Sequence, residues 1–189
     1  MSFNITLNLS DLSYFDIGHF PPEIRRELLV ATESINELKV LISIIEQPRN
    51  NITEVGFVGI SLQRNQVKSF IYTSHEFLQS LHHFKYISPD IVKKDIQLLI
   101  IDVERTFPGI VRARDSVAHA NERRAGRDRK KEVKGSLYHG NQNGTFIEFQ
   151  DSRGRFGLDV SIGTVEKLQK FAYQLVSIAN EKKDIFYKR

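Results

Sequence analysis

The chain has 189 residues, a net charge of +4, an ordinary apolar content and no cysteine. The length suits one domain with a sizeable core, and the lack of cysteine excludes disulfides, zinc–thiolate sites and cysteine nucleophiles. The N-terminus lacks a basic stretch followed by an apolar run, and no apolar segment is long enough to cross a bilayer. We therefore expect a single cytoplasmic domain over residues 1–189 with no membrane segment.

The N-terminal half predicts an extended arm followed by two long helices. Apolar and polar residues alternate over residues 3–10, which is typical of a strand, so residues 1–20 are expected to form an arm. The first helix should begin at Pro21-Pro22 and end before Pro48. The second should run from about residue 54 to residue 84, and its apolar face is Val67, Phe70, Ile71, Phe77, Leu78 and Leu81.

Two histidines stand at the end of this second helix, in the sequence His82-His83-Phe84-Lys85-Tyr86. Imidazoles, aromatic rings and a cation are groups that contact nucleic acids. The simpler interpretation, which we prefer, is that Phe84 is buried and both histidines are exposed. Neither histidine has a metal ligand four residues away, so we expect no metal site here.

The segment Ser88-Pro89-Asp90 predicts the start of a third helix, with Ser88 as its capping residue. The many apolar residues from Ile91 to Val103 indicate that this helix is buried. Phe107-Pro108-Gly109 should then break the chain, and a fourth helix should begin near Pro108.

The last third of the chain predicts a basic loop, a small sheet and a final helix. Residues 123–134 are strongly charged and contain almost no apolar residue, so a loop or frayed helix end is expected. Strands are predicted at about residues 134–139, 145–150 and 155–160, giving a β-meander over residues 134–160. Ser161 should cap the C-terminal helix, and residues 182–189 look like a tail. The fold class is thus mainly α, with a four- to five-helix bundle and a three-stranded antiparallel meander before the last helix.

The fourth helix carries both apolar residues and chemically useful ones. Ile110, Val111, Val117 and Ala118 predict its buried face, and Arg114 lies on or beside that face. Asp115 stands four residues before His119, so its carboxylate can orient the imidazole ring. Arg114 and His119 diverge by about 140° around the helix, which favours a site completed by a second, antiparallel copy.

The residues Arg114-Asp115-Ser116-Val117-Ala118-His119, followed by Ala120-Asn121-Glu122-Arg123, resemble the motif of the HEPN superfamily. The order of helices, small sheet and last helix is similar as well. The resemblance implies a HEPN-like bundle, a metal-independent endoribonuclease centre formed by Arg114 and His119, and a homodimer. It also implies a defence or toxin–antitoxin setting, in which an antitoxin or another defence-system protein is a partner.

The chemistry of RNA cleavage gives each motif residue a role. His119 would transfer a proton to or from the ribose 2′-hydroxyl, Arg114 would hold the scissile phosphate, and Asp115 would orient His119. Attack by the 2′-hydroxyl needs no cofactor and no metal, and it leaves a cyclic phosphate. The chain contains no P-loop, dinucleotide-binding glycine motif, Gly-x-Ser-x-Gly elbow or His-Glu-x-x-His motif.

A basic stretch adjoins this motif. Residues 105–134 contain ten Lys/Arg against four Asp/Glu, a local charge of +6. Such a stretch suits a phosphate backbone, although a solvated loop is the common alternative. The candidate RNA-binding residues are Arg112, Arg123, Arg124, Arg127, Arg129, Lys130 and Lys131. A different class of function also remains open, namely a non-catalytic RNA- or protein-binding regulatory module.

Overall fold

The computed structural model describes residues 17–45, 52–118, 139–140, 146–151 and 154–187. The short 3-10 helix η1 (Ile17–His19) leads into α2 (Pro22–Ile45), which is followed by α3 (Ile52–Ile87) and α4 (Asp90–Thr106). Next come the short helix α5 (Ile110–Ala118), strands β1 (His139–Gly140), β2 (Phe146–Asp151) and β3 (Gly154–Asp159), and helices α7 (Ile162–Glu181) and α8 (Lys183–Phe186). The expected mainly helical fold with a small sheet before the last long helix is confirmed.

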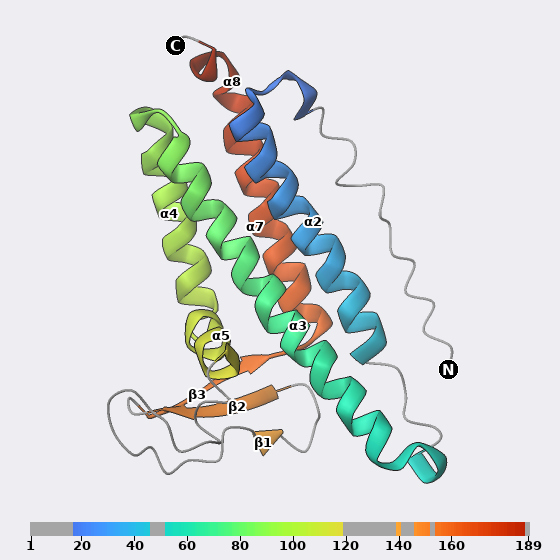
Figure 1. The fold of residues 1–189 in the computed structure, drawn as a ribbon. Helices are drawn as coiled ribbons and strands as arrows, with labels where there is room; N and C mark the ends of the chain where they lie inside the picture. The colour runs from blue at the N-terminus through green and yellow to red at the C-terminus, as the bar shows by residue number, and fades with distance from the viewer. Residues whose placement is uncertain (1–16, 46–51, 119–138, 141–145, 152–153, 188–189) are drawn as a thin grey trace.

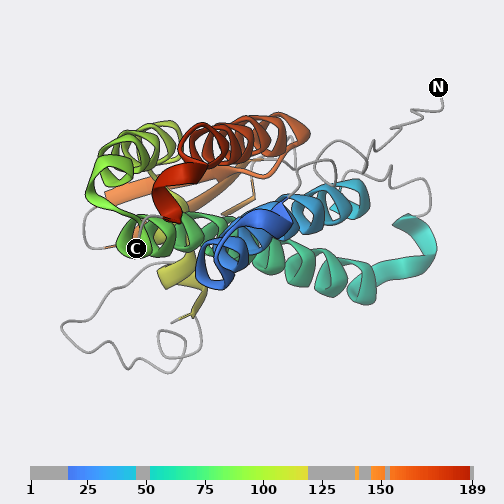
Figure 2. The ribbon, with the colours of Figure 1, turned by 90° about the horizontal axis from the view of Figure 1, so that it is seen from above.

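Four long helices form the bundle, and each packs on two others. Helix α2 contacts α3 and α7, while α4 contacts α3 and α7. The chain runs alternately down and up through α2, α3, α4 and α7 (Figure 1). Seen from above, α4 and α7 form one layer of the bundle and α2 and α3 form the other (Figure 2). Short connections join α2 to α3 and α3 to α4, which makes these neighbours antiparallel, whereas α5 and the sheet lie between α4 and α7 in the chain.

The core consists of the apolar faces that the helical spacing predicts. The predicted face of α3 is buried throughout: Val67, Phe70, Ile71, Phe77, Leu78 and Leu81 are at most 3% exposed. In α7, Val165, Leu168, Ala172 and Leu175 are buried, and the Ser161 hydroxyl accepts a hydrogen bond from the Thr164 amide as the expected cap. Among the described residues, no helix combines the length and apolar character needed to cross a membrane.

Helix α4 differs from its prediction at both its start and its outer face. The Ser88 hydroxyl does not cap α4; it donates to the Phe84 carbonyl and so bonds the last turn of α3. A serine hydroxyl can donate to a backbone carbonyl four residues earlier in a helix instead of capping the next one. The sequence alone does not show which of the two bonds forms. Ile91 and Leu98 are 59% and 62% exposed, so α4 is buried along one face only.

A small antiparallel sheet lies at one end of the bundle, in the order β1-β2-β3. Ile147 of β2 pairs with Leu158 of β3, and both side chains are buried. This pairing gives the sheet an apolar face, on which α5 packs. The strands predicted at about residues 145–150 and 155–160 correspond to β2 and β3, whereas most of the predicted first strand, residues 134–138, lies outside the described residues.

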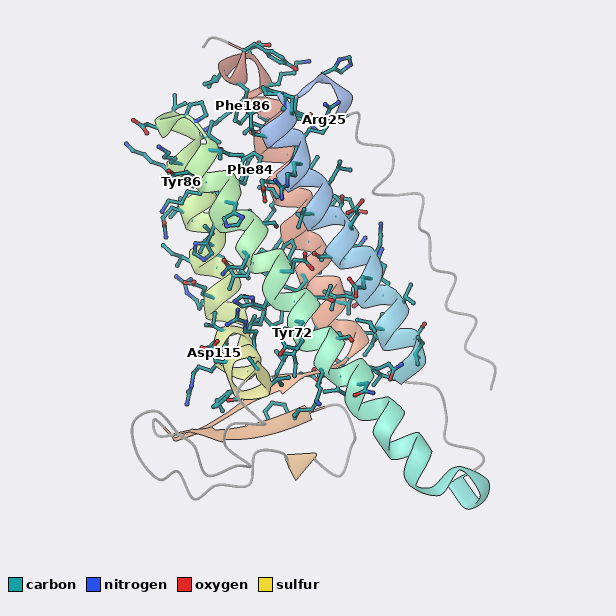
Figure 3. All side chains as sticks on the ribbon, in the orientation of Figure 1. Arg25, Tyr72, Phe84, Tyr86, Asp115 and Phe186 are labelled. Carbon is teal, nitrogen blue, oxygen red and sulfur yellow. The ribbon has the colours of Figure 1, made fainter. Side chains whose placement is uncertain are left out.

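Both ends of the described chain meet at the other end of the bundle, where the sequence predicts only an arm and a tail. Phe186 of α8 is 5% exposed and packs edge-to-face against Phe20 and Phe84, with ring centroids 5.9 and 6.0 Å apart. Figure 3 shows Phe84 and Phe186 together at this end. The expected tail is therefore wrong for residues 183–186, because Phe186 supplies apolar surface that closes the core. The predicted strand at residues 3–10 lies outside the described residues.

We expect Phe186→Ala to lower the free energy of unfolding by about 3–5 kcal/mol, because it removes a buried ring and leaves a cavity between two others. Tyr187→Ala is the matched control, since the Tyr187 side chain is 53% exposed and its loss opens no cavity. Chemical denaturation of both variants measures the difference. Equal stabilities would mean that α8 does not close the core.

Candidate functional site

Helix α5 is positioned by a close backbone contact with β3. Gly109 precedes the helix, and a Cβ atom there would lie 2.5 Å from the Gly157 carbonyl oxygen. On the same side, the Arg112 guanidinium lies over the Phe156 ring, 4.0 Å from its centroid, a cation–π arrangement. The structure thus gives Arg112 a contact with the sheet, and its RNA-binding role stays a prediction.

The buried face of α5 is only partly the one that the sequence predicts, since Ile110 is buried and Val117 packs against the core as expected. Ile110, Ala113 and Ser116 are buried, whereas Val111 is 42% exposed and Ala118 is exposed. The helix contacts α3 on one side and the sheet on the other. These two contacts bury the side of the helix that carries Ala113 and Ser116 and leave the side with Val111 and Ala118 exposed. Arg114, next to this face, is half exposed rather than enclosed.

Arg114 and Asp115 contact each other directly. Arg114 NH1 lies 2.9 Å from Asp115 Oδ1, and the two side chains are 41% and 44% exposed. An exposed pair of this kind contributes only about 0–1 kcal/mol, so the guanidinium can exchange the carboxylate for another anion at little cost. His119, which the sequence places beside Asp115, lies outside the described residues.

A groove of about 650 Å³ runs between α2 and α3 and ends at α5. Its lining includes Arg26 and Glu27 from α2, Tyr72, His75 and His83 from α3, and Arg114 from α5. Figure 3 shows Tyr72 and Asp115 in the half of the bundle nearer the sheet, far from Phe84 and Tyr86. The groove therefore brings residues from three separate helices to the motif arginine.

His75 is the groove residue that sequence reasoning missed. The half-buried ring lies with its Nε2 3.5 Å from Gln79 Nε2, one turn further along α3. Burial lowers the pKa of His75 below its ordinary value of 6.5, and the positive charge of Arg114 lowers this pKa further, while Asp115 raises it. Little in the sequence selects His75 as a site residue. Tyr72 stands three residues before it and Gln79 four residues after it, so the three side chains share one face of the helix, and this was the one indication of a site.

The two histidines at the end of α3 lie as expected, with Phe84 buried and both imidazoles accessible. His82 Nε2 is 3.6 Å from Glu104 of α4, and His83 Nδ1 is 3.8 Å from Glu27 of α2. Each distance allows an ion pair when the histidine is protonated. Within the part of the chain that the structure describes, no three His, Cys, Asp or Glu side chains are grouped to hold a metal ion.

The remaining candidate residues, Arg123, Arg124, Arg127, Arg129, Lys130 and Lys131, lie outside the described residues. Of the predicted catalytic residues, the structure brings Arg114 and Asp115 together. Comparison of the chain with protein-family models, curated proteins and solved structures found no significant match. The site is therefore interpreted from its own residues.

We expect Arg114→Gln to raise the pKa of His75, because the substitution removes a positive charge that opposes protonation of the ring. Asp115→Asn should lower the pKa of His75, because it removes a negative charge that favours the protonated ring. An NMR titration of the histidine side-chain nitrogens measures both shifts. Arg105→Gln, on the exposed side of α4, is the control and should leave this pKa unchanged; no response to Arg114→Gln would contradict the proximity of the two groups.

Proposed function

We propose that the protein is a metal-independent endoribonuclease of the HEPN type that cleaves RNA by attack of the ribose 2′-hydroxyl. The observation that carries this proposal is the position of Arg114, half exposed at the end of a groove and paired with the partly exposed carboxylate of Asp115. A guanidinium in this setting suits a phosphate, which it binds through two parallel hydrogen bonds. The sequence supports the same proposal, because Arg114, Asp115 and His119 have the spacing of the motif of that superfamily.

The roles follow from the chemistry of the reaction. Arg114 binds the scissile phosphate and stabilises the extra negative charge of the transition state. His119 transfers a proton, and Asp115 supports its orientation. Tyr72 offers a ring that is 42% exposed in the same groove, and an unpaired base can stack on such a ring, so single-stranded RNA is the favoured substrate.

The partners come from the resemblance and from charge. The basic residues at positions 123–131 would extend the phosphate-binding surface beyond Arg114. A second copy of the chain would add a second motif, as the divergence of Arg114 and His119 on one helix favours. A toxin–antitoxin or defence setting, with a protein partner that controls the nuclease, rests on analogy with the superfamily.

The alternative is a non-catalytic RNA- or protein-binding module. The direct contact between Arg114 and Asp115 favours it, because a carboxylate on the guanidinium competes with a phosphate. In that case the groove binds a partner without proton transfer. Incubation of the purified protein with labelled RNA separates the two functions.

We expect the wild-type protein to cleave RNA in EDTA and to leave 2′,3′-cyclic phosphate ends. His119→Ala should slow cleavage by about 100-fold to 10,000-fold, the usual contribution of a positioned acid or base, and should change stability little because His119 is not among the predicted core residues. Gel analysis of end-labelled RNA and thermal unfolding provide the two measurements. Cleavage by His119→Ala at the wild-type rate would favour the binding module.

RNA binding should depend on salt through the basic segment, because phosphate contacts release counterions. Replacing Arg127, Arg129, Lys130 and Lys131 with glutamine should flatten the slope of log affinity against log salt concentration by up to about 3. The matched control removes the same charge from Lys93, Lys94, Lys170 and Lys183, which lie outside residues 105–134 and outside the groove lining. Identical slopes for both variants would identify the segment as a solvated loop without RNA contacts.

A further inference from the structure

Cleavage of RNA by its own 2′-hydroxyl requires two proton transfers. A base takes the proton of the attacking hydroxyl, and an acid supplies a proton to the departing 5′-oxygen. Arg114 carries a permanent charge and exchanges no proton, and His119 can perform one transfer at a time. A second titratable group near Arg114 is therefore needed for the proposed function, from either this chain or a second copy.

His75 is placed to be that group within one chain. It lines the same groove as Arg114, although the two residues stand on different helices, and Arg114 acts electrostatically on its ring. Gln79 lines the same groove, and its side-chain amide nitrogen lies 3.5 Å from Nε2 of the half-buried His75 ring. This long contact holds the ring weakly, so a substrate hydroxyl can replace the amide at Nε2.

The electrostatic surroundings favour the neutral form of His75. Burial is the main cause of its lowered pKa, and Arg114 adds to that effect. Among the described residues, the charged and titratable groups that line the groove or act on His75 are Arg26 and Glu27 of α2, Tyr72, Glu76, His82 and His83 of α3, and Arg114 and Asp115 of α5. A histidine that is neutral at pH 7 can accept a proton, which makes it a base rather than an acid.

We propose that His75 is the catalytic base of this site and that His119 is the acid. This inference rests on the proposed function. The 2′-hydroxyl proton moves to His75 Nε2 while the 2′-oxygen forms a bond to phosphorus. The bond from phosphorus to the 5′-oxygen breaks, and that oxygen takes a proton from protonated His119. The products are a 2′,3′-cyclic phosphate and a 5′-hydroxyl, and Arg114 holds the phosphate throughout.

Two substrates separate the base from the acid. One is an RNA oligonucleotide, and the other is uridine 3′-(4-nitrophenyl phosphate), whose leaving group departs without a proton. His75→Asn should slow the cleavage of both by about 100-fold to 10,000-fold, because both need the 2′-hydroxyl to be deprotonated. His119→Ala should slow only the RNA reaction. The acidic limb of the wild-type rate profile should lie below pH 6.5, the ordinary pKa of histidine, and should disappear in His75→Asn.

His19→Asn is the matched control, since His19 lies in η1 at the other end of the bundle, outside the groove lining and outside the groups that act on His75. It should cleave both substrates at the wild-type rate, and thermal unfolding should show that all variants are folded. If the wild type cleaves no RNA, the proposed function fails. If the wild type is active and His75→Asn matches it, only the present inference fails, and the second transfer comes from a second copy. Recovery of His75→Asn on the nitrophenyl substrate, or an equal loss in His19→Asn, would also overturn it.

Discussion

The start of helix α5 packs against β3 through a backbone contact that leaves no space for a side chain at Gly109. A Cβ at Gly109 would collide with the Gly157 carbonyl, and a Cβ at Gly157 would lie 1.9 Å from the Phe146 ring. A larger residue at position 109 would therefore push the start of α5 away from β3, whereas one at position 157 would collide with Phe146 of β2. Since Arg114 follows Gly109 by little more than one helical turn, the place of the guanidinium in the groove depends on this contact.

The central position of α3 explains how three histidines of one helix meet three different neighbours. His75 lies in the groove that ends at Arg114 of α5, His82 approaches Glu104 of α4, and His83 approaches Glu27 of α2. Helix α3 packs on all three of these helices. His82 and His83 diverge by about 100° around the axis and so meet different helices, whereas His75 lies about two turns before His82 on nearly the same side, where α5 is the neighbour. His75 lines the groove and has a lowered pKa.

The charge in the groove is balanced rather than strongly basic. Arg26 and Arg114 stand against Glu27 and Glu76, and the side chain of Glu27 is only 12% exposed. Attraction of a polyanion over a long distance would therefore have to come from the basic stretch between residues 105 and 134, whereas the groove can offer a local phosphate contact at Arg114. Salt screens exposed charges beyond about 10 Å. A few charges in the groove can therefore position a phosphate that is already close, whereas attraction of the RNA depends on the many charges of the basic stretch.

The sequence by itself determined the long helices, the strand pairs and the residues of the main core, because periods of 3.6 and 2 directly report which side chains face inward. It also located Arg114 and Asp115 as exceptional residues on a helix after a break. Only the tertiary structure decided that α5 buries Ala113 and Ser116 and leaves Val111 and Ala118 exposed, that Phe186 closes the core, and that His75 shares a groove with Arg114. Each of these depends on a neighbour distant in the chain, and a periodic pattern within one segment carries no information about such a neighbour.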